Sequence, residues 1–171
     1  MDCSATAGWV TVIFTPLTGA AAVATAVIAY LASNSWRKGL EYQRYDECLA
    51  AVLYVQGAAY ACAAAIENRK RPELDKQPWV EKNIWDTYAA AWKRQSRFRA
   101  AFSIASGYEP TKFSTDLLGK VDTILHGLRD QANSPAPDER IIKILLTNLD
   151  DIVEKVKEAI GGARRRRLFQ G

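Results

Sequence analysis

The chain has 171 residues, of which 49% are hydrophobic, and its 23 basic and 19 acidic side chains give a formal charge of +4. This length suits one compact domain with an accessory segment and leaves little room for two full domains. The apolar share argues against wholesale disorder. Acids and bases alternate along most of the chain after Trp36. A broad nucleic-acid-binding surface is therefore not expected.

The segment from Trp9 to Ala32 contains no charged residue. As a helix it would reach about 36 Å, against a bilayer hydrocarbon core of about 30 Å. A cleaved export signal would need basic residues before the apolar run, whereas only Asp2 precedes it. A core helix that is apolar on every face would need a larger domain around it. The sequence thus predicts a transmembrane helix over residues 9–32, with the signal and the core helix as alternatives.

The flanks of this segment predict its orientation. Residues 1–8 contain one acid and no base, whereas Arg37, Lys38 and Arg44 follow the segment. Because basic residues collect on the cytoplasmic side, we expect a single-pass protein of the plasma (inner) membrane. Its short N-terminus would be extracytoplasmic and the rest cytoplasmic. The lipid bilayer is then the first partner that the sequence implies.

Small and hydroxyl side chains line one face of the predicted membrane helix. They recur at steps of three and four residues, a spacing that permits close helix approach and interhelical hydrogen bonds. We therefore expect a packing face for a homo-oligomer or for a membrane-protein partner. The alternative is that each threonine bonds its own backbone. The predicted face consists of Thr11, Thr15, Thr18, Ala22, Thr25 and Ala29.

Proline-containing breaks divide the rest of the chain into four segments with helical periodicity. The breaks are 69–78, 106–112 and 133–138. Short connections make consecutive helices antiparallel neighbours. The predicted fold is all-α, with an N-terminal single transmembrane helix followed by an antiparallel cytosolic bundle of about four helices. The bundle would occupy residues 33–167, and residues 168–171 would form a tail. The predicted helices cover about 33–68, 79–105 and 111–131, with a fourth that opens at Ser134 or Asp138.

A second stretch without charge, Cys48 to Ile66, raises an alternative topology. Two spans, 9–32 and 48–66, would form a membrane hairpin of a pore-forming or membrane-perturbing kind. This topology would place Arg69, Lys70 and Arg71 on the side that disfavours basic residues. Alanine also adds little hydrophobic gain, so we favour a central bundle helix for this stretch.

Two faces are expected on the second bundle helix. Aromatic residues form a stripe of the kind that usually faces a core, namely Trp85, Tyr88, Trp92 and Phe102 with Gln95, and with Phe98 at its edge. A basic face consists of Lys82, Lys93, Arg94 and Arg97. It is expected to be solvated, with acidic lipid or a partner protein as the alternative.

The C-terminal basic run consists of Arg164, Arg165, Arg166 and Arg167. In an antiparallel four-helix arrangement this run returns to the membrane side, where it would contact an anionic surface. A solvated tail is the competing interpretation. Contact with nucleic acid is disfavoured because no aromatic stacking platform accompanies the run.

Motifs for catalysis are not found in the sequence. His126 is the only histidine, and the cysteines lack the spacing of metal ligands. Gly161 and Gly162 are expected to end a helix and so do not open a phosphate-binding loop. We therefore predict no catalytic residue, metal, cofactor or small-molecule substrate. The expected function is that of a membrane-anchored helical scaffold or regulatory subunit, which acts by protein binding and is not an enzyme.

Overall fold

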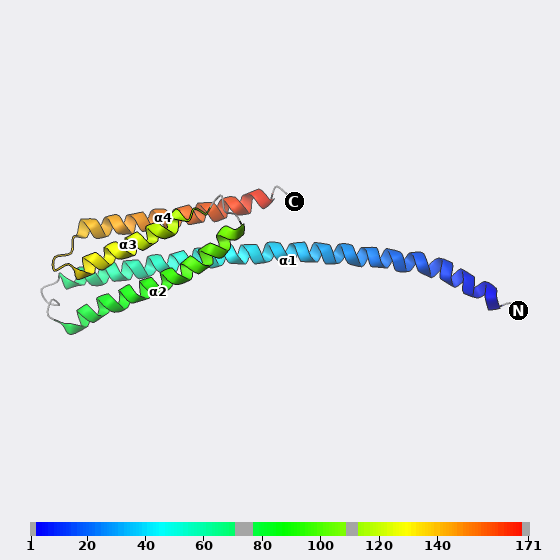
Figure 1. Cartoon of the computed structure of the whole chain (residues 1–171), viewed down its shortest axis with the longest axis horizontal. Helices are drawn as coiled ribbons and strands as arrows, with labels where there is room; N and C mark the ends of the chain where they lie inside the picture. Colours follow the sequence, from blue (N-terminus) through cyan, green and yellow to red (C-terminus); the bar gives the residue numbers. More distant parts are fainter. Residues whose placement is uncertain (1–2, 71–76, 109–112, 169–171) are drawn as a thin grey trace. The chain divides into compact units, whose positions relative to one another are not determined.

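The computed structural model describes the backbone of residues 3–70, 77–108 and 113–168, and the side chains of 22–70, 77–108 and 113–162. Within these residues the chain forms four helices and no strand, which confirms the all-α fold (Figure 1). The helices are α1 (Cys3–Arg69), α2 (Pro78–Tyr108), α3 (Asp116–Asn133) and α4 (Glu139–Leu168).

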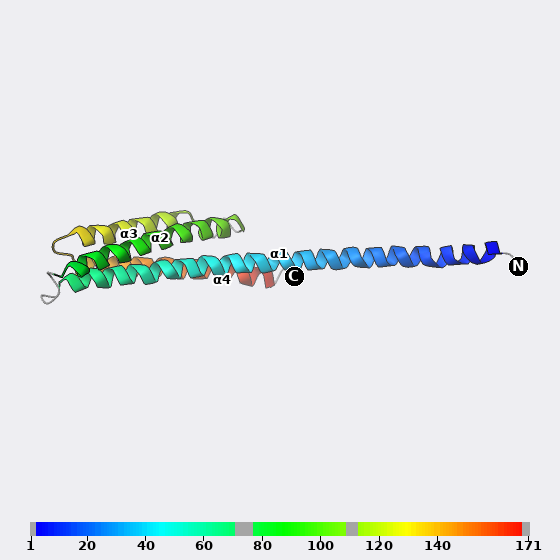
Figure 2. The same ribbon diagram turned by 90° about the horizontal axis from the view of Figure 1, so that it is seen from below.

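The chain divides into two units, Met1–Leu40 and Glu41–Gly171. In the first unit the described backbone is a single helix, the N-terminal part of α1. The second unit contains the remainder of α1 with α2, α3 and α4. In it, consecutive helices run antiparallel, as Figures 1 and 2 both show. A helical bundle is therefore confirmed for this unit.

The connection between α3 and α4 shows why the fourth helix begins where it does. The Asp138 carboxylate accepts a hydrogen bond from the Arg140 backbone N–H at 2.8 Å. This bond satisfies one of the amide donors that every helix start leaves unpaired. The backbone N–H of Asp138 in turn donates to the Gln131 side chain at 2.7 Å. Asp138 is thus the N-cap, one of the two residues that the sequence offered.

The end of α4 differs from the sequence-based prediction. Gly161 and Gly162 were expected to end the helix, but α4 continues through both to Leu168. A glycine inside a helix costs about 1 kcal/mol relative to alanine, which weakens a helix without forbidding it. The residues that follow are alanine, arginine and leucine, all strong helix formers, and they carry the helix onward.

The core-facing side of α2 also differs from the predicted stripe. Phe98 was placed at the edge, yet its side chain is fully buried, whereas Trp92 is 36% exposed. Both sets of residues follow helical spacing, so periodicity alone could not separate them. The second unit buries the side that contains Phe98, and Trp85, Tyr88 and Trp92 lie along its flank. The residues of α2 that are buried are Val80, Ile84, Ala91, Gln95, Phe98, Phe102 and Ala105.

Aromatic rings join α1, α2 and the start of the α3 region in the core. Phe102 on α2 packs edge-on against Phe113, with ring centroids 5.3 Å apart. Phe113 also stacks on Tyr45 of α1 at 6.0 Å. Such pairs add about 0.5–1.5 kcal/mol each beyond the burial of their area.

A glycine permits close packing between α3 and α4. A Cβ on Gly127 would lie 2.8 Å from a methyl group of Leu145, so the absence of a side chain at Gly127 leaves space for Leu145.

The uncharged stretch from Cys48 to Ile66 contributes much of this core. It packs in a unit whose other helices are rich in charged residues. Leu53 and Tyr60 of the same stretch remain about two-fifths exposed. Its buried members are Cys48, Val52, Val55, Ala58, Ala59, Cys62, Ala63, Ala65 and Ile66.

Candidate functional site

The first unit presents an uncovered apolar helix surface. Every described side chain from Ala22 to Arg37 is exposed, including Val23 at 65% and Ile28 at 66%. Among the described residues, one helix, over Ala22–Arg69, is long and apolar enough to cross a membrane. Core helices of soluble proteins and export signals meet the same criterion of length and composition. The apolar stretch of this helix that meets the criterion is 44% buried, so it lies in the second unit and is not the exposed part from Ala22 to Arg37.

The predicted packing face of the membrane helix falls partly within the described side chains. Ala22, Thr25 and Ala29 lie on one side of α1 by their spacing, and all three are exposed in the single chain. The side chains of Thr11, Thr15 and Thr18 lie outside the described residues. The same holds for Arg164, Arg165, Arg166 and Arg167, whose backbone forms the end of α4.

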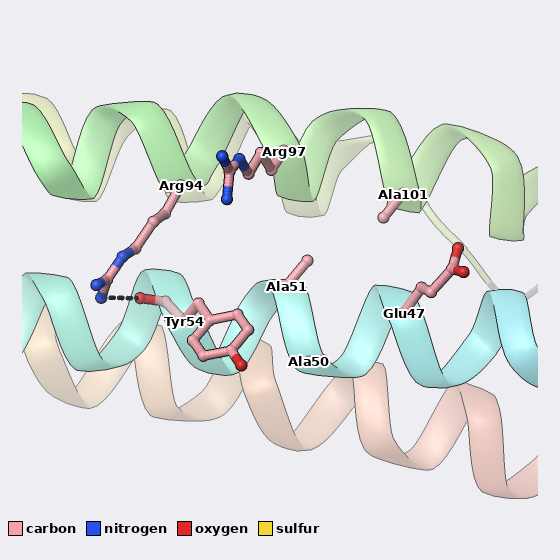
Figure 3. Close-up of a pocket in the computed structure, with 7 residues that line it drawn as sticks. All are labelled: Glu47, Ala50, Ala51, Tyr54, Arg94, Arg97 and Ala101. Carbon is pink, nitrogen blue, oxygen red and sulfur yellow. Dashed lines mark hydrogen bonds between the residues drawn. The ribbon is translucent and has the colours of Figure 1, made fainter.

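A groove of about 500 Å³ runs between α1 and α2 in the second unit, and we name it the α1–α2 groove (Figure 3). Its volume lies in the range of ordinary ligand-binding clefts, about 300–1,000 Å³. Small alanine side chains leave it open, and long polar side chains border it. The lining residues are Glu47, Ala50, Ala51 and Tyr54 on α1, and Arg94, Arg97 and Ala101 on α2.

The charges at the α1–α2 groove are unequal. Arg94 donates to the backbone carbonyl of Tyr54 at 3.2 Å, and its guanidinium lies 6.0 Å from the centre of the Tyr54 ring. Arg97 makes no hydrogen bond or ion pair with another described residue. Glu47, in contrast, already pairs with Arg44 at 2.7 Å. The positive charge of the two α2 arginines is therefore not neutralised within this part of the chain.

A polar network joins α2 to α3 beneath the surface. Gln95 is only 3% exposed, and its side-chain amide donates to the Asp122 carboxylate. Arg99 forms an ion pair with the second oxygen of the same carboxylate. A buried amide without a partner would be destabilising by about 1–3 kcal/mol, so this network stabilises the bundle.

A second carboxylate, Asp150, joins α4 to α1. It accepts hydrogen bonds from the Gln56 amide and from the Tyr60 hydroxyl, each at 2.7 Å. The hydrogen bond to Asp150 is the main reason that the pKa of Tyr60 is raised above its usual value of 10.0; partial desolvation and the negative charge of Asp150 act in the same direction.

This contact predicts a difference in alkaline stability between the wild type and Tyr60→Phe. Because the folded pKa is raised, the stabilisation by Tyr60 is fully present below pH 10 and is lost as the pH rises through the folded pKa. Wild-type protein should lose more of its free energy of unfolding between about pH 9 and pH 12 than Tyr60→Phe does. Urea unfolding across this range measures the difference, and parallel curves for the two proteins would contradict the expectation.

The two cysteines of the bundle are buried thiols. Burial raises the pKa of the Cys48 thiol to about 12 and also raises that of Cys62. Both thiols are therefore protonated at neutral pH, and a protonated thiol is a poor nucleophile and metal ligand. His126 is exposed and its ring lies 5.1 Å from that of Trp92. In the part of the chain that the structure describes, no three acidic, cysteine or histidine side chains gather in a way that could hold a metal ion.

Comparison with models of protein families, with curated proteins and with solved structures finds no match for this chain.

The sequence identified one half of the α1–α2 groove. Arg94 and Arg97 were recognised as part of a basic face, with a solvated surface as the first interpretation. Ala50, Ala51 and Tyr54 were not recognised, because their position opposite these arginines depends on how α1 and α2 pair in space. The available signal was the run of small residues along α1, which is typical of both buried and partner-binding helices.

Proposed function

We propose that this protein is a membrane-anchored helical-bundle protein that acts by binding another protein, as a scaffold or regulatory subunit. The observation that carries the proposal is the uncharged, exposed side-chain surface of α1 between Ala22 and Trp36. No described part of the first unit covers these side chains. A lipid bilayer is the environment that such a surface fits best.

The free energy gained when these apolar side chains leave water supports a location in a bilayer. Moving a side chain of the size of valine or leucine out of water stabilises a protein by about 1.5–3 kcal/mol. Val23, Val27, Ile28 and Leu31 are each more than half exposed. Scaled by their exposed fractions, the four would together contribute about 4–7 kcal/mol on entering lipid. This gain is comparable to the whole stability of a small domain, so an aqueous location for the segment is strongly disfavoured.

The orientation that we propose follows from the charges at the ends of the segment. Arg37, Lys38 and Arg44 lie on the bundle side, so the bundle would be cytoplasmic and the N-terminus outside. Trp36 and Tyr30, both 71% exposed, would lie at the membrane–water interface, where aromatic side chains are favoured.

The burial of Cys48, Val52 and Cys62 supports a bundle position for the stretch 48–66 over a second span. The native cysteines cannot report the topology, because the bundle and the lipid would both shield them. Introduced cysteines at exposed positions are needed, and Ala64 and Ala136 are suitable.

The topology test uses Ala64→Cys and Ala136→Cys, each in a chain whose native cysteines are replaced by serine or alanine. A membrane-impermeant maleimide should label both positions only after the cells are permeabilised, because the bundle is cytoplasmic. In a hairpin with its N-terminus outside, lipid would shield residue 64, and residue 136 would be labelled in intact cells. Labelling after denaturation in detergent serves as the control for total reactive thiol.

A further inference from the structure

One face of α1 in the second unit has no helix packed over it among the described residues. Its members recur at alternating steps of three and four residues, the spacing of a coiled-coil seam. All are exposed, and four of the six have a small side chain or none. A Cβ on Gly57 would meet nothing within 4 Å. We name this face the open seam, and it consists of Glu47, Ala50, Tyr54, Gly57, Ala61 and Ala64.

The open seam is continuous with the α1–α2 groove. Glu47, Ala50 and Tyr54 belong to both, and α2 borders the groove with Arg94 and Arg97 (Figure 3). The two arginines are three residues apart on one helix, so their side chains leave α2 on the same side. The combined surface therefore has an apolar floor of small side chains and a positively charged edge.

The dimensions of this surface favour a helical occupant. From Ala50 to Ala64 the seam extends about 21 Å, or about four helical turns. Small residues let two helix backbones approach closely, at about 8 Å. A lipid headgroup or a free phosphate would occupy only the arginine edge and would leave the floor exposed to water.

We propose that the open seam and the α1–α2 groove bind an acidic amphipathic helix of a partner protein. Small apolar side chains of that helix pack on Ala50, Gly57 and Ala61, and its carboxylates pair with Arg94 and Arg97. Arginine suits this role because its planar guanidinium binds a carboxylate through two parallel hydrogen bonds. This inference deepens the proposed binding role and does not depend on the membrane span.

The experiment measures the affinity of three synthetic helical peptides for the full-length protein in mild detergent, a sample that can be prepared whether or not the chain spans a membrane. The peptides have 18 residues and share an alanine–leucine face, and their flanking positions are all glutamate, all glutamine or all lysine. The glutamate peptide should bind about tenfold more tightly than the glutamine peptide, and the lysine peptide should bind most weakly. The double variant Arg94→Gln/Arg97→Gln should remove the preference for glutamate.

Two further variants are needed. One is a control for the arginine edge of the groove, and the other tests the floor of small side chains. Lys93→Gln makes a single charge change on an exposed residue of α2 that does not line the groove, so the glutamate peptide should bind it as it binds the wild type. Gly57→Leu places a large side chain in the open seam, where a Cβ meets nothing within 4 Å in the free protein, and should weaken all three peptides about tenfold or more. Circular dichroism of each variant serves as the control for its folding.

Four results would overturn the inference. The first is equal affinity for the glutamate and lysine peptides, and the second is absence of glutamate-peptide binding up to millimolar concentration. The third is that Arg94→Gln/Arg97→Gln lowers binding to vesicles of anionic lipid and leaves the peptides unaffected, which would assign the edge to lipid. The fourth is that the same variant dissociates an oligomer of this chain, which would assign the surface to a second copy. Failure of the membrane span would appear in fractionation and would leave peptide binding intact.

Discussion

Replacement of Val23 and Val27 by arginine is expected to release the protein from the membrane fraction. Both side chains are more than half exposed and lie in the uncharged part of α1. An arginine at the centre of a membrane helix costs about 2.5–3.5 kcal/mol on an insertion scale, and less toward the ends, so the two together cost at most about 5–7 kcal/mol. Membrane and soluble fractions of cells that express the variant, separated by ultracentrifugation, measure the effect.

The matched control for this pair is Ser33→Arg with Ser35→Arg. These positions follow the predicted membrane helix of residues 9–32 and precede the native Arg37. Two further basic residues there reinforce the cytoplasmic side and should leave the protein in the membrane fraction. Equal membrane retention of both double variants would show that the segment does not reside in lipid.

Phe98→Ala is expected to lower the free energy of unfolding by about 3–5 kcal/mol. The Phe98 ring is fully buried and packs edge-on against Phe102, with centroids 5.5 Å apart. Removal of the ring leaves a cavity that the neighbouring helices can fill only in part. Urea unfolding of the full chain in mild detergent, followed by circular dichroism, measures the loss.

Trp92→Ala provides the comparison, because Trp92 is the larger residue but is 36% exposed. It contacts Tyr88 and His126 along the flank of α2, and its replacement should destabilise the protein by less than half as much as Phe98→Ala. The opposite order would mean that the core faces the tryptophan stripe, as the sequence pattern first indicated.

Helical periodicity predicted the number, order and approximate ends of the helices in the bundle. The proline-containing breaks lie where the helices end, and Asp138 caps α4 as one of the two predicted residues. Two features escaped prediction for physical reasons. Gly161 and Gly162 lie inside α4, because the helix-forming residues after them outweigh the glycine penalty. Phe98 lies at the centre of the α2 core face, because adjacent stripes of one helix satisfy the same spacing and only packing chooses between them.

The candidate binding surface was less predictable than the fold. Arg94 and Arg97 were visible as a basic face, but a charged face on a helix usually contacts only water. Their significance depends on Ala50, Ala51 and Tyr54 of α1, which lie far earlier in the chain and come near them only through helix pairing. The small residues of the open seam resemble those of a buried helix face, and only their exposure distinguishes them.

Extraction of membranes with alkaline carbonate tests the central claim most directly. If the uncharged part of α1 spans a bilayer, the wild-type protein should remain in the pellet after carbonate treatment and ultracentrifugation, and detergent should be needed to dissolve it. Recovery of the intact protein in the carbonate supernatant without detergent would contradict membrane anchorage.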